Sequence, residues 1–187
     1  MSDSKEETKR CNWVNLKSPL YINYHDKEWC VPSHDDRYLF EMLILESFQA
    51  GLSWSTILKR REHFREAFDE FDVIRVSQYD EVKKEALREN KGIIRNKLKI
   101  KAAVNNAKLF IGIQKEYGSF SKYIWGFTDH QVIKNQTGTF RATSPLSDTI
   151  SKHLKRRGMK FVGSTIIYAY LQAIGIVDDH EPQCFRF

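Results

Sequence analysis

Residues 154–175 read LKRRGMKFVGSTIIYAYLQAIG and give the strongest single indication of how this chain folds. The stretch contains a basic helix end, a short connection with Lys160 and Gly163, and an apolar helix from Ser164 to about Ile174, closed by Gly175. Backbone N–H groups at the start of the second helix can bind a phosphate without reading base sequence. The pattern is that of a helix-hairpin-helix, although an ordinary helical hairpin with a solvated charged end fits these residues equally well.

Helix signals dominate the rest of the chain too, because apolar residues recur at spacings of three and four while strand-like alternation is rare. One helix is expected to start near Asp35 or Asp36 and to end at Gly51, and Ser53, Asp80 and Ser147 are the expected N-caps of later helices. The longest helix is expected from about Asn96 to Tyr117. The polar stretch 128–143 is expected to be a loop. The sequence therefore predicts an all-α fold, with residues 1–10 as a disordered tail and residues 11–187 as one domain.

The chain carries a formal net charge of +6, which favours a polyanionic partner such as nucleic acid but also suits a generally solvated surface. Its 187 residues are 41% hydrophobic and 29% charged, as in ordinary globular domains. No apolar run approaches the roughly 18 residues that a membrane span needs, and the N-terminal stretch has no apolar core of a signal peptide. We therefore expect a protein of the cytoplasm with no membrane partner.

Four potential metal ligands stand near the two ends of the chain, at Cys11, His25, His180 and Cys184. Two thiolates and two imidazoles form a closed, tetrahedral zinc site of the structural kind. Scattered cysteines and histidines are also common as plain core or surface residues, and the spacing alone does not decide between the two interpretations.

Glu46 lies in the run LESFQAGLSW, on an otherwise apolar helix face just before Gly51. A buried, unpaired carboxylate is costly, so such a group is usually functional or paired; a solvated glutamate at the helix end is the alternative. Aromatic residues cluster in the preceding segment, at Trp13, Tyr21, Tyr24 and Trp29. They suit either the protein core or a pocket that stacks on a flat ligand.

Taken together, six stretches resemble the constitutive 3-methyladenine DNA glycosylase family, part of the helix-hairpin-helix superfamily. They are RCNW at 10–13, PLYINYHDKEWCVP at 19–32, LFEMLILESFQAGLSWSTILKRRE at 39–62, KGIIRNKLKI at 91–100, LKRRGMKFVGSTIIYAYLQAIGIVDDH at 154–180, and the final Cys184. They occur in the family's order and cover most of the chain.

The resemblance implies one structural Zn²⁺ per chain, held by Cys11, His25, His180 and Cys184 in segments 11–25 and 180–184. It implies a base pocket of Tyr24, Glu46 and Trp54, lined by Trp13, Tyr21 and Trp29, with Glu46 as the catalytic group. It identifies 154–175 as the helix-hairpin-helix, where Lys155, Lys160, Gly163 and Ser164 are expected to contact DNA phosphate. Outside the hairpin, Gly51 and Leu52 are expected to enter the gap left by a flipped nucleotide. The implied activity is hydrolytic release of 3-methyladenine from double-stranded DNA, which leaves an abasic site, by a bacterial enzyme that we expect to be monomeric.

Three positions depart from the family pattern: Cys30 and Ser47 replace glycines, and Asp178 stands where the wider superfamily carries its catalytic aspartate. Asp178 is interpreted either as an assisting group or, as we favour, as a residue that orients His180. Two other functions stay open: a catalytically silent binder of damaged DNA, and a glycosylase for another base. The latter normally needs a catalytic aspartate or a Schiff-base lysine, and the lysine-rich sequence does not exclude a lyase step.

Overall fold

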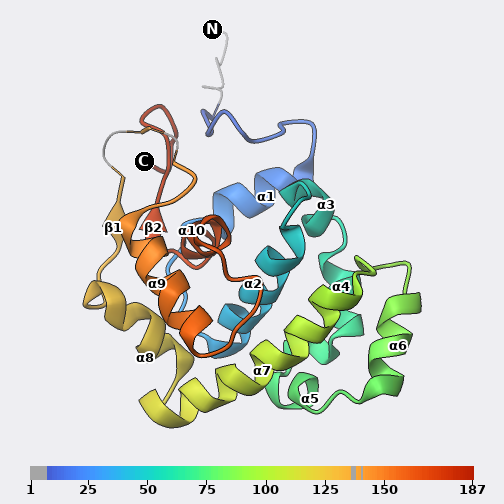
Figure 1. Ribbon diagram of the computed structural model, residues 1–187. Helices are drawn as coiled ribbons and strands as arrows, with labels where there is room; N and C mark the ends of the chain where they lie inside the picture. Colours follow the sequence, from blue (N-terminus) through green and yellow to red (C-terminus); the bar gives the residue numbers. More distant parts are fainter. Residues whose placement is uncertain (1–7, 136–137, 140) are drawn as a thin grey trace, which may run out of the picture.

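The computed structural model describes residues 8–135, 138–139 and 141–187, and the regular secondary structure of these residues is almost entirely helical (Figure 1). The helices are α1 (Pro19–Lys27), α2 (Asp36–Gln49), α3 (Trp54–Leu58), α4 (Arg61–Ala67), α5 (Val73–Ser77), α6 (Glu81–Glu89), α7 (Lys97–Tyr117), α8 (Phe120–Trp125), α9 (Pro145–Arg156) and α10 (Ser164–Ala173). Single 3-10 turns lie at Asp69–Phe71 and Gly126–Thr128. The prediction of an all-α fold is confirmed. The expected tail lies outside the described residues over 1–7.

Helix α2 lies near the centre of the molecule and packs against α3, α7, α8 and α10 (Figure 1). Ten consecutive residues of this helix, 39–48, are buried. Its first turn is fixed from outside, because the Asp36 carboxylate accepts hydrogen bonds from the backbone N–H groups of Phe120 (2.9 Å) and Ser121 (2.7 Å) at the start of α8. Among the described residues, no helix is long and apolar enough to cross a membrane.

Most of the predicted helix starts are correct, since Asp35, Ser53 and Asp80 each accept a hydrogen bond from a backbone N–H in the first turn that follows. The prediction of Ser147 as a cap is wrong by three residues. Helix α9 begins at Pro145 with Ser144 as its N-cap, and Ser147 is the reciprocal partner of Ser144 in a capping box. A proline in the first helical position is favoured, because its missing N–H would have no partner there.

The segments at the two ends of the chain meet on one side of the molecule (Figure 1). The backbone N–H groups of Cys30 and Ser33 donate to the carbonyl groups of Gln172 (2.9 Å) and Ile174 (3.0 Å) at the end of α10. Near this junction two short parallel strands pair, β1 (Ile133–Lys134) and β2 (Val177–Asp178). β1 lies within the stretch 128–143 that we expected to be a loop. Arg10, within the predicted tail, forms an ion pair with Asp26 (2.7 Å).

Gly175 allows this close approach. It adopts φ +77°, and a Cβ at this position would lie 2.3 Å from the backbone of Val31 and Pro32. Both the left-handed conformation and the lack of space therefore require glycine.

Replacing Gly175 with alanine should lower the free energy of unfolding by more than about 2 kcal/mol, because the substitution adds backbone strain and an overlap with residues 31–32. Gly112, within α7 and with no atom near its own Cβ position, is the matched control. Gly112→Ala should stabilise the protein by up to about 1 kcal/mol. Chemical denaturation measures both values; equal effects of the two substitutions would contradict this account of the junction.

Candidate functional site

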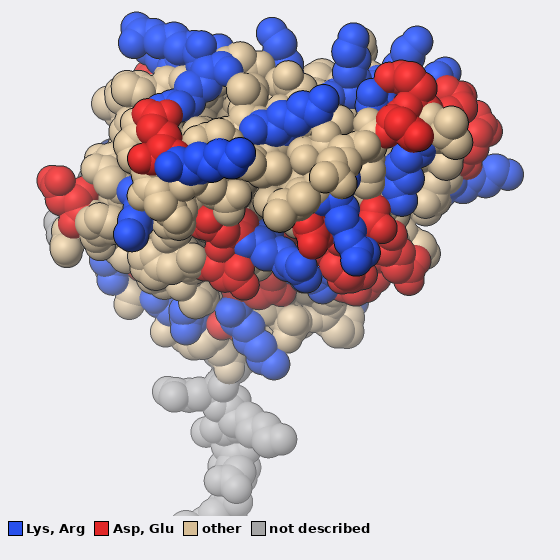
Figure 2. All heavy atoms as spheres, turned by 90° about the horizontal axis from the view of Figure 1, so that it is seen from below, with Lys and Arg blue, Asp and Glu red and all other residues tan. Residues whose placement is uncertain are grey.

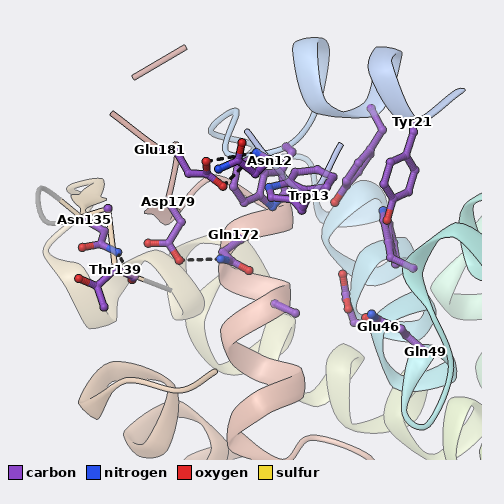
Figure 3. Close-up of a pocket in the computed structure, with 15 residues that line it drawn as sticks. Asn12, Trp13, Tyr21, Glu46, Gln49, Asn135, Thr139, Gln172, Asp179 and Glu181 are labelled. Carbon is purple, nitrogen blue, oxygen red and sulfur yellow. Dashed lines mark hydrogen bonds between the residues drawn. The ribbon is translucent and has the colours of Figure 1, made fainter. Parts of the chain in front are cut away.

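A cavity of about 490 Å³ opens between α1, α2, α3, α10 and the two terminal segments (Figure 3). All six residues that the sequence assigned to a base pocket line it: Trp13, Tyr21, Tyr24, Trp29, Glu46 and Trp54. The other lining residues are Asn12, Gln49, Asn135, Gly138, Thr139, Ala169, Gln172, Asp179 and Glu181. The walls thus come from parts of the chain that are distant in sequence.

Glu46 lies on α2, is only 3% exposed, and has one carboxyl oxygen, Oε2, that is buried with no hydrogen-bond partner among the described residues. Burial raises its pKa from 4.5 to about 8, so the group is largely protonated at neutral pH. Glu41, one turn earlier on the same helix, is also buried but contacts Arg61 (2.6 Å) and Arg65 (2.9 Å). The contrast indicates that Glu46 is kept unpaired to face a ligand.

Aromatic rings form the walls beside Glu46. The rings of Tyr24 and Trp54 lie with their centroids 5.2 Å apart, and Trp13 packs against Tyr21 (5.5 Å) and Trp29 (4.8 Å). The indole Nε1 of Trp54 is also buried without a partner among the described residues. Ring faces attract cations, so this wall and the Glu46 carboxyl group together favour a flat ligand that carries positive charge.

The turn between α2 and α3 presents an apolar side chain beside the cavity. Gly51 adopts φ +82° and Leu52 is 42% exposed. A buried lysine of α7, Lys99, stabilises this turn. Its Nζ donates hydrogen bonds to the carbonyl groups of Phe48 (2.8 Å) and Ala50 (2.6 Å). An exposed leucine on a fixed turn has the form of a wedge.

The hairpin predicted at 154–175 consists of α9, a turn through Gly158 (φ +95°) and Phe161 (φ +54°), and α10. Lys155 and Lys160 are exposed on it. Gly163 is the N-cap of α10 and supplies no capping side chain, so that the first-turn N–H groups are not capped from within. Ser164 is less available than expected, since its Oγ lies 2.8 Å from Ser147 Oγ.

Asn106 on α7 fixes this turn, and sequence reasoning missed it. Its side chain accepts a hydrogen bond from the Lys160 N–H (2.9 Å) and donates one to the Lys160 carbonyl (2.9 Å). A polar residue on the buried face of a long helix is the signal that could have found it.

Basic side chains are unevenly distributed over the surface. Figure 2 shows Lys and Arg gathered along the upper edge of the face seen from below, and acidic side chains mainly near its middle and right. Such an edge suits a polyanion.

The N- and C-terminal segments also bring together a group of potential metal ligands, with atoms of Cys11, His25 and Cys184 all within 4.8 Å of one another. His180 lies beside them, with its ring centroid 5.3 Å from that of His25 and its Nε2 buried without a partner among the described residues. Both imidazole Nδ1 atoms are bonded to carboxylates, His25 to Asp26 and His180 to Asp178 (2.7 Å each). Nε2 is therefore the atom that each imidazole can offer to a metal ion, and His25 Nε2 lies 3.5 Å from Cys184 Sγ and 3.5 Å from the Cys11 backbone N. The residues fit a metal ion.

The two aspartates of the sequence VDDH differ in their surroundings. Asp178 accepts from both the backbone N–H (3.2 Å) and the ring of His180 and is absent from the cavity walls. Asp179, which the sequence analysis did not single out, lines the cavity. The lining residues among those described include no lysine.

The fold is thus a helical domain with a basic hairpin, and the candidate site is an aromatic cavity with a buried, unpaired carboxyl group. The model of the family described as methyladenine glycosylase matches residues 13–187. The chain belongs to this family.

Individual relatives are similar over nearly the whole chain. DNA-3-methyladenine glycosylase 1 of Escherichia coli is 44% identical and aligns over 94% of this chain and 95% of its own. A crystal structure of 3-methyladenine DNA glycosylase I has a TM-score of 0.91 at 46% identity, covering 95% of this chain and 98% of its own. The Staphylococcus aureus 3-methyladenine DNA glycosylase I, in a structure on the basis of 3-methyladenine recognition, has a TM-score of 0.87 at 36% identity, covering 90% of this chain and 92% of its own.

Proposed function

We propose that this protein is a DNA glycosylase that flips 3-methyladenine out of double-stranded DNA and hydrolyses its glycosidic bond, leaving an abasic site. The observation that carries the proposal is the buried, unpaired carboxyl group of Glu46 beside the rings of Tyr24 and Trp54. Family membership supports it, and relatives that align over nearly the whole chain carry this activity in their names. The protein acts in the bacterial cytoplasm as a monomer.

The substrate's own charge explains why such a pocket suffices. A 3-methyladenine base is cationic while it is attached to deoxyribose, so its bond is already weak and it departs as a neutral molecule. The aromatic faces attract the cationic ring, and Glu46 accepts a hydrogen bond from its exocyclic amine. As the cation enters, the Glu46 pKa falls and the carboxylate forms only when the correct ligand is present. Normal bases are neutral and lack this interaction.

The hairpin and the turn at Gly51 and Leu52 bind the DNA and help to bring the damaged base into the cavity. The uncapped N-terminus of α10, with Lys155 and Lys160, binds phosphate on the hairpin side. Leu52 fills the gap in the base stack after flipping, and Gly51 allows the turn to approach the duplex. The absence of lysine among the described lining residues favours simple hydrolysis over a lyase step.

Replacing Glu46 with glutamine should weaken binding of 3,9-dimethyladeninium, a permanently cationic analogue of the substrate base, about tenfold to a hundredfold, the loss expected for one charge-assisted hydrogen bond. Glutamine resembles the protonated acid, so thermal stability should stay close to that of the unmodified protein. Excision from methylated DNA should slow, though by less than binding weakens. Calorimetry and single-turnover release of free base measure these effects.

Asp178→Asn is the comparison variant, because this side chain contacts His180 and lies away from the cavity walls. With metal content checked, it should retain most of the activity. A folded but inactive Asp178 variant beside a normal Glu46 variant would reverse the roles assigned here.

We propose further that Zn²⁺ is the metal held by Cys11, His25, His180 and Cys184. Two thiolates and two imidazole Nε2 atoms are a donor set that zinc prefers in closed structural sites. Zinc bound there cross-links the two ends of the chain and takes no part in the reaction.

Protein purified without chelators should contain one equivalent of zinc. Cys184→Ser should lose it and unfold at a lower temperature, because metal binding is coupled to folding. Cys30→Ser is the comparison variant, because Cys30 lies with Asp178 and His180 in a second group of potential ligands, all within 4.8 Å of one another. In our proposal Cys30 does not bind the zinc, so its replacement should leave the zinc content unchanged. Metal analysis that finds no zinc in the unmodified protein, or full zinc in Cys184→Ser, would refute the assignment.

A further inference from the structure

The cavity has a second carboxylate, Asp179, which lies across it from Glu46 on the segment that follows α10 (Figure 3). Its Oδ2 accepts hydrogen bonds from the Tyr168 hydroxyl (2.6 Å) and from Gln172 Nε2 (2.6 Å). Its Oδ1 is buried and has no partner among the described residues. One oxygen is therefore held while the other is left for something that enters the cavity.

Two side chains of α10 hold the Asp179 carboxylate in a fixed position. Tyr168 and Gln172 are four residues apart on α10, so both point from the same helix face and fix the carboxylate from one side. A buried acceptor without a donor is unfavourable, and native structures rarely keep one without a role. Among the described residues that line the cavity, Glu46 Oε2 is the other buried carboxyl oxygen with no hydrogen-bond partner.

Glu46 acts on the base, and the charge that develops on the deoxyribose during hydrolysis is a separate charge on which a second group can act. When the bond between C1′ and N9 breaks, its electron pair leaves with the base, which becomes neutral, and the positive charge passes to C1′ and O4′ of the deoxyribose. Water oxygen then bonds to C1′ and its proton passes to solvent. With the base held against Glu46, the sugar lies toward the other wall, where Asp179 stands.

We propose that Asp179 is a catalytic residue whose Oδ1 faces the deoxyribose and stabilises its positive charge during base release. A fixed negative charge next to a developing cation is a large source of catalysis. The inference rests on the proposed function and adds the group that acts on the sugar.

Neither neighbouring acid fits this role. Asp178 is bonded to His180 and does not line the cavity. Glu181 lines it, but its two oxygens accept from the Asn12 N–H (3.1 and 3.2 Å), and Gln183 donates to it as well. Glu181 therefore provides a matched control, a carboxylate of the same cavity that is already satisfied.

The test compares two duplexes that carry abasic-site analogues of the same shape. A pyrrolidine is positively charged at neutral pH where the sugar cation would form, and a tetrahydrofuran is neutral. The unmodified protein should bind the pyrrolidine duplex at least about tenfold more tightly, the value of one charge-assisted hydrogen bond. Asp179→Asn should bring this ratio close to one, and Glu181→Gln should leave it unchanged.

Single-turnover release of 3-methyladenine should slow about a hundredfold in Asp179→Asn and by less than about threefold in Glu181→Gln. Free 3-methyladenine should still bind Asp179→Asn normally, which shows that the Glu46 side is intact. Tyr168→Phe, which keeps the carboxylate but removes one of its donors, should have an intermediate ratio, and it serves as the test if Asp179→Asn does not fold.

An unchanged ratio in a folded Asp179→Asn, or in Tyr168→Phe where that variant serves as the test, overturns the inference. If the unmodified protein releases no 3-methyladenine at all, the proposed function fails instead. The two failures are therefore distinguishable.

Discussion

Glu46 lies on the central helix with a buried carboxyl oxygen that has no hydrogen-bond partner among the described residues, and this arrangement opposes folding. The protein tolerates it in two ways. The carboxyl group keeps its proton at neutral pH, as its pKa of about 8 requires, and the surrounding residues 39–48 are packed into the core. The same features make the site selective, since ionisation becomes favourable only when a cation arrives.

The walls around Glu46 depend on joining the two ends of the chain. Trp13 and Trp29 come from the N-terminal segment, Gln172 and Asp179 from the C-terminal part. Three features hold these parts together. They are the backbone hydrogen bonds from residues 30 and 33 to the end of α10, the close approach of the chain at Gly175, and the group Cys11, His25 and Cys184. In our proposal, zinc acts on the site only through this junction. The long α7 has a similar role at two turns, since Asn106 fixes the hairpin turn and Lys99 fixes the turn at Gly51.

The positions of most helix starts could be predicted from the sequence. A helix start depends on short-range hydrogen bonds, and Asp35, Ser53 and Asp80 each accept one from the first turn that follows. The cavity residues followed from the family resemblance rather than from any spacing. Contacts between distant segments were not predictable. Asn106, Lys99 and Asp179 are polar residues whose roles appear only once the partner segment is in place. Cys30, which replaces a glycine of the family pattern, adopts φ +60°, a backbone conformation that favours glycine.

The ionisation of Glu46 tests the account most directly. Carbon-13 NMR of a glutamate-labelled protein, with the Glu46 signal assigned through Glu46→Gln, would follow the carboxyl group across pH. We predict a pKa of about 8 in the free protein and a value below about 7 with bound 3,9-dimethyladeninium, a permanent cation of the same shape as the substrate base. A pKa near the ordinary 4.5 in the free protein, or one that the bound cation leaves unchanged, would contradict the claim that a neutral buried acid becomes charged for its ligand.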